Sequence, residues 1–285
     1  MQKFIISVEA TADLSPELLA QYNIKCVDMH YYVNDVEYTS SDTSMDNKTF
    51  YKNMKEGAKT TTSQVNNFQA KEYLSKLLQE GKDILHLSFT SALSGTYSNL
   101  KATAEELNKD SKNKIVVIDS LCASAGQGLL AILASEKADE FNTIDELANY
   151  IESIKMNISQ LFIVDNLKYL AKSGRVSKVT AAIGSVLQIK PVLHVDNDGK
   201  LTSMAKVISR KKSIITLAEK VASFKNDISN HILITHADCI DEAKILQNAI
   251  QEKLNITAQI LDLGCVIGSH AGPGTLAVFF TGNQR

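Results

Sequence analysis

The expected fold follows from the stretch Ile84-Leu85-His86-Leu87-Ser88-Phe89-Thr90-Ser91-Ala92-Leu93-Ser94-Gly95-Thr96-Tyr97. The run at 84–87 predicts a buried strand, and a helical pattern begins at about Thr96. Hydroxyl side chains, among them Ser91 and Ser94, lie between the two. Free N–H groups and the positive end of the helix dipole meet these hydroxyls, so the turn is suited to hold an anion. The turn contains no lysine or arginine, which favours a single negative charge over a polyphosphate.

The alternation of strand and helix continues on both sides of this stretch. Strands are expected at 3–8, 25–32 and 115–118, and helices from Pro16, at 67–79, at 96–107 and at 123–138. Residues 34–44 are expected to form a hairpin or an exposed loop, and residues 60–64 a hydroxyl-rich loop. Apolar strands that alternate with helices predict a mostly parallel sheet covered on both faces.

The pattern changes after about residue 157. A capping box at Thr143 and Glu146 starts a helix that runs to about residue 155. Strands are then expected at 160–164, 190–195, 201–207, 232–235, 258–263 and 276–280, with short helices at 166–171 and 177–187. The pair Asp198-Gly199 predicts a hairpin turn. The predicted fold class is α/β with two domains: residues 1–157 with a mostly parallel sheet flanked by helices, and residues 158–285 with a mixed sheet and helices.

The composition excludes several classes of function. A formal net charge of -2 over 285 residues gives no electrostatic reason to expect nucleic acid as a partner. The cysteines are scattered without a Cys-x-x-Cys pair, so we expect neither disulfides nor zinc. Free cysteines fit a reducing compartment, and we therefore expect a cytoplasmic location. We expect no signal peptide and no membrane span. Neither a Walker A run nor a Gly-x-Gly-x-x-Gly fingerprint occurs, so nucleotide binding is unsupported and no cofactor is expected. There is no Gly-x-Ser-x-Gly elbow either. No metal is expected, because His231 and His236 flank a strand at a spacing that points their side chains to opposite faces.

Three segments are candidates for a site, and each has a plain structural alternative. Thr62, Ser91 and Ser94 precede predicted helices and could face one anion, or they could simply cap those helices. His270 lies in the glycine-rich string Gly268-Ser269-His270-Ala271-Gly272-Pro273-Gly274, which we interpret as a loop. Its imidazole could donate to an oxyanion or act as a nucleophile or base, or it could merely be exposed. Arg175 could reach an acidic group or anchor the surface between the domains.

Several strings together resemble the DegV family, in the order in which that family has them. They are Thr11-Ala12-Asp13-Leu14, Thr62-Ser63-Gln64, Ser91-Ala92-Leu93-Ser94-Gly95-Thr96-Tyr97, Ile118-Asp119-Ser120, Ser173-Gly174-Arg175-Val176-Ser177, Ile189-Lys190-Pro191-Val192-Leu193 and the glycine-rich string around His270. The resemblance covers essentially the whole chain. Four positions depart from the family pattern: Glu9 and Ala10 replace its Asp-Ser, Ser173 replaces a glycine, and Val65 replaces a proline.

The resemblance implies a non-catalytic protein that binds one long-chain, palmitate-like fatty acid. Thr62 and Ser94 would hydrogen-bond the carboxylate near the domain interface, with Ser91 and His270 close by, and the acyl chain would lie in an apolar tunnel. The protein would present the carboxylate to an ATP-binding fatty acid kinase subunit, and Arg175 would belong to the surface that this subunit meets. Transient membrane contact is also implied. The alternative interpretation is a subunit of a dihydroxyacetone-kinase-like enzyme, in which His270 binds a small carbonyl substrate.

Overall fold

The computed structural model describes residues 2–176 and 190–285 of the chain. Its first sheet has the strand order β2-β1-β6-β7 and is parallel throughout. The strands are β1 (Ile5–Glu9), β2 (Ile24–Val27), β6 (Ile84–Ser88) and β7 (Ile115–Asp119). All five residues of β1 and of β6 are buried, as expected for strands that are covered on both faces. The predicted parallel sheet of the N-terminal half is thus confirmed.

The second sheet is mixed, as predicted for the C-terminal half. Its order is β10-β9-β8-β13-β11-β12, and within it β11 and β12 are parallel whereas the other pairs are antiparallel. The strands are β8 (Ile158–Ile163), β9 (Val192–Val195), β10 (Leu201–Ala205), β11 (Ile232–His236), β12 (Gln259–Asp262) and β13 (Leu276–Thr281). The Asp198-Gly199 pair forms the turn between β9 and β10, with Gly199 at φ +74°.

A third, small sheet corrects two expectations. It has the order β4-β3-β5 and consists of β3 (His30–Val33), β4 (Val36–Thr39) and β5 (Thr60–Thr62). The single strand expected at 25–32 is therefore two strands in different sheets. The change occurs at Asp28, whose carboxylate accepts hydrogen bonds from Ser40 and Ser41 beside β4. Residues 60–62, expected as a loop, pair with β3 because this hairpin offers a free edge.

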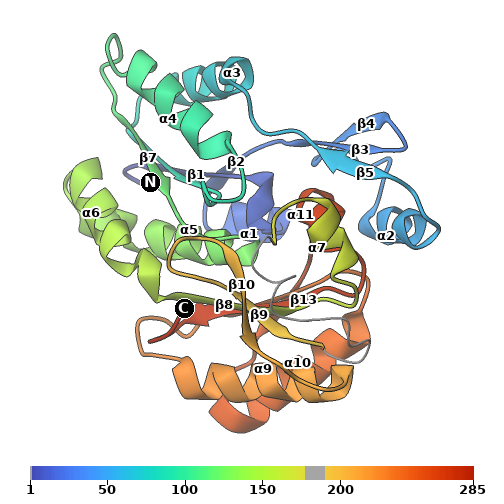
Figure 1. The fold of residues 1–285 in the computed structure, drawn as a ribbon. Helices are drawn as coiled ribbons and strands as arrows, with labels where there is room; N and C mark the ends of the chain where they lie inside the picture. Colours follow the sequence, from blue (N-terminus) through green and yellow to red (C-terminus); the bar gives the residue numbers. More distant parts are fainter. Residues whose placement is uncertain (1, 177–189) are drawn as a thin grey trace.

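Helices cover both sheets and separate them (Figure 1). They are α1 (Pro16–Gln21), α2 (Asn47–Lys55), α3 (Asn67–Leu78), α4 (Thr96–Leu107), α5 (Ala125–Lys137), α6 (Ile144–Ile154), α7 (Lys168–Lys172), α9 (Arg210–Phe224), α10 (Ile240–Leu254) and α11 (Cys265–Ala271). Single 3-10 turns occur at η1 (Ala10–Ala12), η2 (Ala138–Glu140) and η3 (Lys155–Asn157). The pair α3 and α4 forms one outer layer, and the pair α9 and α10 the other. The helix expected at 177–187 lies outside the described residues.

Helix α5 lies between the two sheets and joins them. Residues 125–134 are all buried, because α5 packs against β1 and β6 on one side and against β8, β11 and β13 on the other. A helix that is apolar all round belongs in such a position. The cluster of buried apolar side chains continues from one sheet to the other, so the domain division between residues 157 and 158 stays a prediction. In the described part of the chain, no helix is both long and apolar enough to cross a bilayer.

Candidate functional site

A cavity of about 690 Å³ lies at the carboxyl end of β6, between the loop that follows this strand and residues of the second sheet. This volume is within the roughly 300–1,000 Å³ that is usual for small-molecule sites. Much of the wall is apolar and comes from both halves of the chain, including Phe89, Phe162, Leu170, Val195, Leu201 and Phe279. Water held against such a surface is readily displaced by an apolar ligand. The cavity therefore suits a molecule with a substantial hydrocarbon part.

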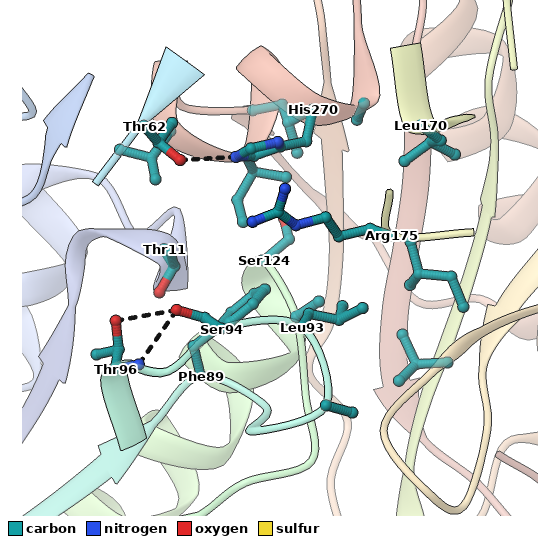
Figure 2. A pocket seen from close by; sticks show the side chains of 18 of the residues that line it. Thr11, Thr62, Phe89, Leu93, Ser94, Thr96, Ser124, Leu170, Arg175 and His270 are labelled. Atoms are coloured by element: carbon teal, nitrogen blue, oxygen red, sulfur yellow. Dashed lines mark hydrogen bonds between the residues drawn. The ribbon is translucent and has the colours of Figure 1, made fainter. Parts of the chain in front are cut away.

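Polar side chains gather in one part of this cavity (Figure 2). Thr62 Oγ1 lies 2.7 Å from His270 Nε2, and Ser94 Oγ donates to Thr96 Oγ1 at 3.0 Å. Ser94 Oγ also accepts at 3.2 Å from the Thr96 N–H, which is the first N–H of α4, although the N-cap of this helix is Gly95. Ser91 lines the same cavity and is exposed. The structure thus brings Thr62, Ser91, Ser94 and His270 to one cavity, although they come from three separate segments.

The loop after β6 and the segment after β5 are packed tightly together. The Val65 N–H donates to Thr96 Oγ1 at 3.2 Å, and the Asn99 side chain donates to the Val65 carbonyl at 2.8 Å. A Cβ placed on Gly95 would lie only 2.3 Å from Gln64 Oε1, so the glycine permits this close approach. These contacts bring Thr62 to the same side of the cavity as Ser94.

His270 lies on a helix, which corrects the expected loop. It is the sixth of the seven residues of α11, and Gly272 ends the helix with φ +82°. The glycines of this string allow close packing, since a Cβ at Gly268 or Gly272 would collide with Tyr51 or Tyr169. Burial, and next the nearby Arg175, lower the pKa of His270 to about 4. The imidazole is therefore neutral at pH 7 and carries one N–H.

The buried carboxyl group of Asp13 fixes the start of α11. It accepts from the Gly264 N–H at 3.0 Å and from Ser124 Oγ at 2.6 Å. Burial raises the pKa of Asp13 to about 7, although both hydrogen bonds act in the opposite direction. Asp13 thus connects the end of η1 with the first residues of α5 and α11.

Arg175 changes the expected electrostatics of the site. The sequence of the turn suggested neutral donors alone, but Arg175, which follows α7, also lines the cavity. Figure 2 shows its side chain directed into the space between the Thr62–His270 pair and the Ser94–Thr96 pair. The predicted contact of this exposed residue with a partner protein stays a prediction. An anion in the cavity would meet hydroxyl groups, an imidazole and one guanidinium.

Sequence reasoning did not assign several polar residues of the wall to the site, among them Thr11 and Gln160. Thr11 Oγ1 donates to Gln127 Oε1 at 3.0 Å, and Gln160 Oε1 accepts from the Ala123 N–H at 2.8 Å. Thr11 lies two residues after the end of β1, in η1, and this position after a strand is a signal that the sequence offered. Gln160 is in the middle of the buried strand β8, beside Ser159, and nothing local marks it as a site residue.

Other polar groups do not form a metal centre in the described residues. His231 Nε2 lies 2.8 Å from Glu136, whereas His236 faces Asp262 at 3.4 Å, so the two histidines have separate partners. The alternative role of His270 toward a small carbonyl substrate would require a free imidazole nitrogen facing the cavity. Its Nε2 is within hydrogen-bond distance of Thr62, and Nδ1 is the ring nitrogen that has no partner among the described contacts.

Known proteins of similar sequence and similar structure match this chain over nearly its full length. The curated DegV domain-containing protein of Clostridium perfringens is 38% identical over 289 residues, which cover 100% of this chain and 99% of the relative. That of Lactococcus lactis is 33% identical, covering 97% and 96%. A solved structure from Thermotoga maritima, reported to reveal a fatty acid binding function, matches with TM-score 0.85 and 28% identity over 99% of this chain and 100% of its own.

A further solved structure, a fatty acid binding DegV family protein from Streptococcus agalactiae, has TM-score 0.85 and 26% identity over 100% of both chains. The family model described as "Uncharacterised protein, DegV family" matches residues 3–283. A match of this extent, together with relatives above 30% identity over their full length, shows that the chain belongs to the DegV family.

Proposed function

We propose that this protein binds one long-chain, palmitate-like fatty acid. The observation that carries the proposal is a single continuous cavity with an extended apolar wall and a cluster of hydroxyl, imidazole and guanidinium groups in one part. The carboxylate would lie among Thr62, Ser94 and His270, with Ser91 close by, and the acyl chain along the apolar wall. The related proteins from Thermotoga maritima and Streptococcus agalactiae, both described as fatty acid binding, support this assignment.

The hydrocarbon tail would supply most of the affinity. Each buried methylene contributes about 0.8 kcal/mol, so ten of them contribute about 8 kcal/mol. A hydrogen bond to a charged group contributes about 1.5–3 kcal/mol. The head group therefore selects for a carboxylate and orients it, whereas the tail retains the ligand.

The hydrogen-bonding state of His270 decides what Thr62 can offer. Because the imidazole is neutral at pH 7, its Nε2 can carry the proton and donate to Thr62 Oγ1. The Thr62 hydroxyl proton is then free to donate to the carboxylate. Ser94 can do the same by turning its proton away from Thr96. Arg175 adds a positive charge between these two groups.

The remaining parts of the proposal concern partners and place. The protein itself is non-catalytic and presents the bound carboxylate to an ATP-binding fatty acid kinase subunit, which Arg175 would help to contact. It works in the cytoplasm without a cofactor and touches membranes transiently, because a long-chain acid is far more soluble in a bilayer than in water.

Mass spectrometry of the denatured protein tests the binding proposal. The purified protein is unfolded, extracted with organic solvent, and its extract analysed for fatty acids. A long-chain acid in near-stoichiometric yield supports the proposal. An empty extract, together with no binding of added palmitate, would refute it, and a bound small carbonyl compound would instead support the dihydroxyacetone-kinase-like alternative.

A double variant tests the proposed carboxylate site. Thr62→Ala combined with Ser94→Ala should retain extractable lipid but lower the rate at which an ATP-binding kinase subunit phosphorylates the presented acid. Ser153→Ala is the matched control, since this exposed hydroxyl bonds only to Tyr150 of its own helix in the contacts that the structure describes. Unchanged phosphorylation in the double variant would count against the assigned residues.

A further inference from the structure

A completely buried acid, Glu9, lies at the end of β1 below the wall of the cavity. Its carboxylate accepts from Ser88 Oγ at 2.5 Å, from the Phe89 N–H at 3.0 Å, and from the Gln127 side-chain amide. Ser88 ends β6, and Phe89 begins the loop that carries Ser91 and Ser94. Glu9 therefore binds the last residue of β6 and the first residue of the loop.

Glu9 lies beside His86 in the same buried layer. His86 Nε2 lies 3.3 Å from Glu9 Oε1, and both side chains are fully buried. Burial acts to raise the pKa of Glu9, but His86 and the hydrogen bonds from Ser88 and Phe89 together hold it below its ordinary value. Glu9 is thus ionised at neutral pH, and a buried ionised acid keeps its donors in place because their loss is costly.

The other side of His86 extends the same network. Its Nδ1 lies 2.9 Å from Ser7 Oγ, which in turn lies 2.7 Å from the Tyr73 hydroxyl on α3. Tyr73 can donate to Ser7, and Ser7 can donate to His86 Nδ1. His86 Nε2 then faces Glu9 Oε1 at 3.3 Å without a hydrogen bond in the described structure. The network thus joins α3, β1 and β6 beneath the loop.

Gln127 of α5 connects Glu9 with the cavity wall. Its amide nitrogen donates to Glu9 and, at 2.8 Å, to the Leu87 carbonyl. Its oxygen then remains to accept the Thr11 hydroxyl proton, so Thr11 presents only lone pairs to the cavity. Thr11 in this state repels a carboxylate, so donation falls to other groups of the cavity, among them Thr62 and Ser94.

We infer that Glu9 is a positioning residue of the carboxylate end of the cavity. It holds the start of loop 89–95 through Ser88 and Phe89, and it fixes the Thr11 hydroxyl through Gln127. Ser94 therefore meets the head group from a fixed backbone. The inference rests on the proposed fatty acid function, and it concerns the head group alone because none of these contacts touches the apolar wall beyond Phe89.

A comparison of two ligands with the same tail tests the inference. Competition against a fluorescent acyl probe gives the affinities of the delipidated protein for dodecanoic acid and for dodecanol. Glu9→Gln keeps the size of the side chain but replaces one acceptor oxygen by a donor that faces Ser88 and His86. We expect Glu9→Gln to lower the affinity for dodecanoic acid by about tenfold or more, and the affinity for dodecanol by less than about threefold.

Two further variants keep the test decisive. Glu136→Gln is the matched control, because Glu136 forms a similar pair with His231 on the surface, and it should alter neither affinity. Ser88→Ala removes one donor to Glu9 without a charge change, so it should give a smaller loss of the same selectivity and serves if Glu9→Gln does not fold.

The outcomes separate this inference from the proposed function. If the wild-type protein binds neither ligand, the fatty acid proposal itself fails and the inference with it. If the wild type binds the acid but the variants lose both ligands equally, or lose neither, Glu9 has only a structural role and the inference is wrong.

Discussion

Asp13→Asn should reverse part of the pH dependence of folding stability. The Asp13 side chain is 7% exposed, and its pKa rises from 3.8 in the unfolded reference to about 7 in the folded protein. An acid with a higher pKa in the folded state holds more protons there, so raising the pH destabilises the folded protein. A difference of about three in pKa corresponds to about 4 kcal/mol, lost progressively between about pH 4 and pH 7. Asparagine resembles the protonated acid in shape and does not titrate.

The wild-type curve alone would hide this effect, because His270 acts in the opposite direction. Its pKa falls from 6.5 to about 4, so the unfolded chain holds the extra proton and stability increases with pH over the same range, by about 3 kcal/mol. The quantity to measure is therefore the difference between the variant and the wild type. We expect the unfolding free energy of Asp13→Asn minus that of the wild type to increase by about 3–5 kcal/mol between pH 4 and pH 8.

Urea unfolding of the delipidated proteins, followed by circular dichroism at closely spaced pH values, measures this difference. Asp110→Asn, at an exposed position after α4, controls for the general effect of removing one carboxylate. Parallel curves for Asp13→Asn and the wild type would refute the reasoning, because they would show that Asp13 titrates alike in the folded and unfolded chains.

Three further variants probe other parts of the structure. Thr143→Ala removes the hydroxyl that accepts the Glu146 N–H at the start of α6, and it should cost about 1 kcal/mol of unfolding free energy in urea. Gly268→Ala would place a Cβ 2.3 Å from the Tyr51 hydroxyl, and it should destabilise by about 1–3 kcal/mol, seen as a lower Tm. Arg175→Gln should weaken dodecanoic acid by about two- to fivefold at low salt, with little effect at high salt or on dodecanol; an equal loss for both ligands would contradict an electrostatic role.

The local elements were predictable wherever neighbouring residues decide them. The strand, turn and helix around Ser94 occur as expected, with α4 at Thr96–Leu107, because an apolar run and a hydroxyl-rich turn before a helix are short-range signals. The capping box of Thr143 is present for the same reason. The break between β2 and β3 escaped prediction, since an apolar run does not show that its two ends join different sheets.

The candidate site was predictable in its membership more than in its geometry. Thr62, Ser91, Ser94 and His270 were named from hydroxyl-rich turns and a glycine-rich string, and all line one cavity. The helical setting of His270 was missed, because the glycines that suggested a loop serve instead to pack α11 against two tyrosines.

By itself, the sequence determined the alternation of strands and helices, the change from a parallel to a mixed sheet, and the hydroxyl-rich start of α4. Each depends on periodicity, caps and turn residues within a few positions of one another. Only the tertiary structure decided that Arg175 turns into the cavity and that Glu9 is buried against His86. It also set the pKa values of Asp13 and His270. Burial and charge partners come from segments far apart in the chain, so they exist only once the sheets and α5 have packed together.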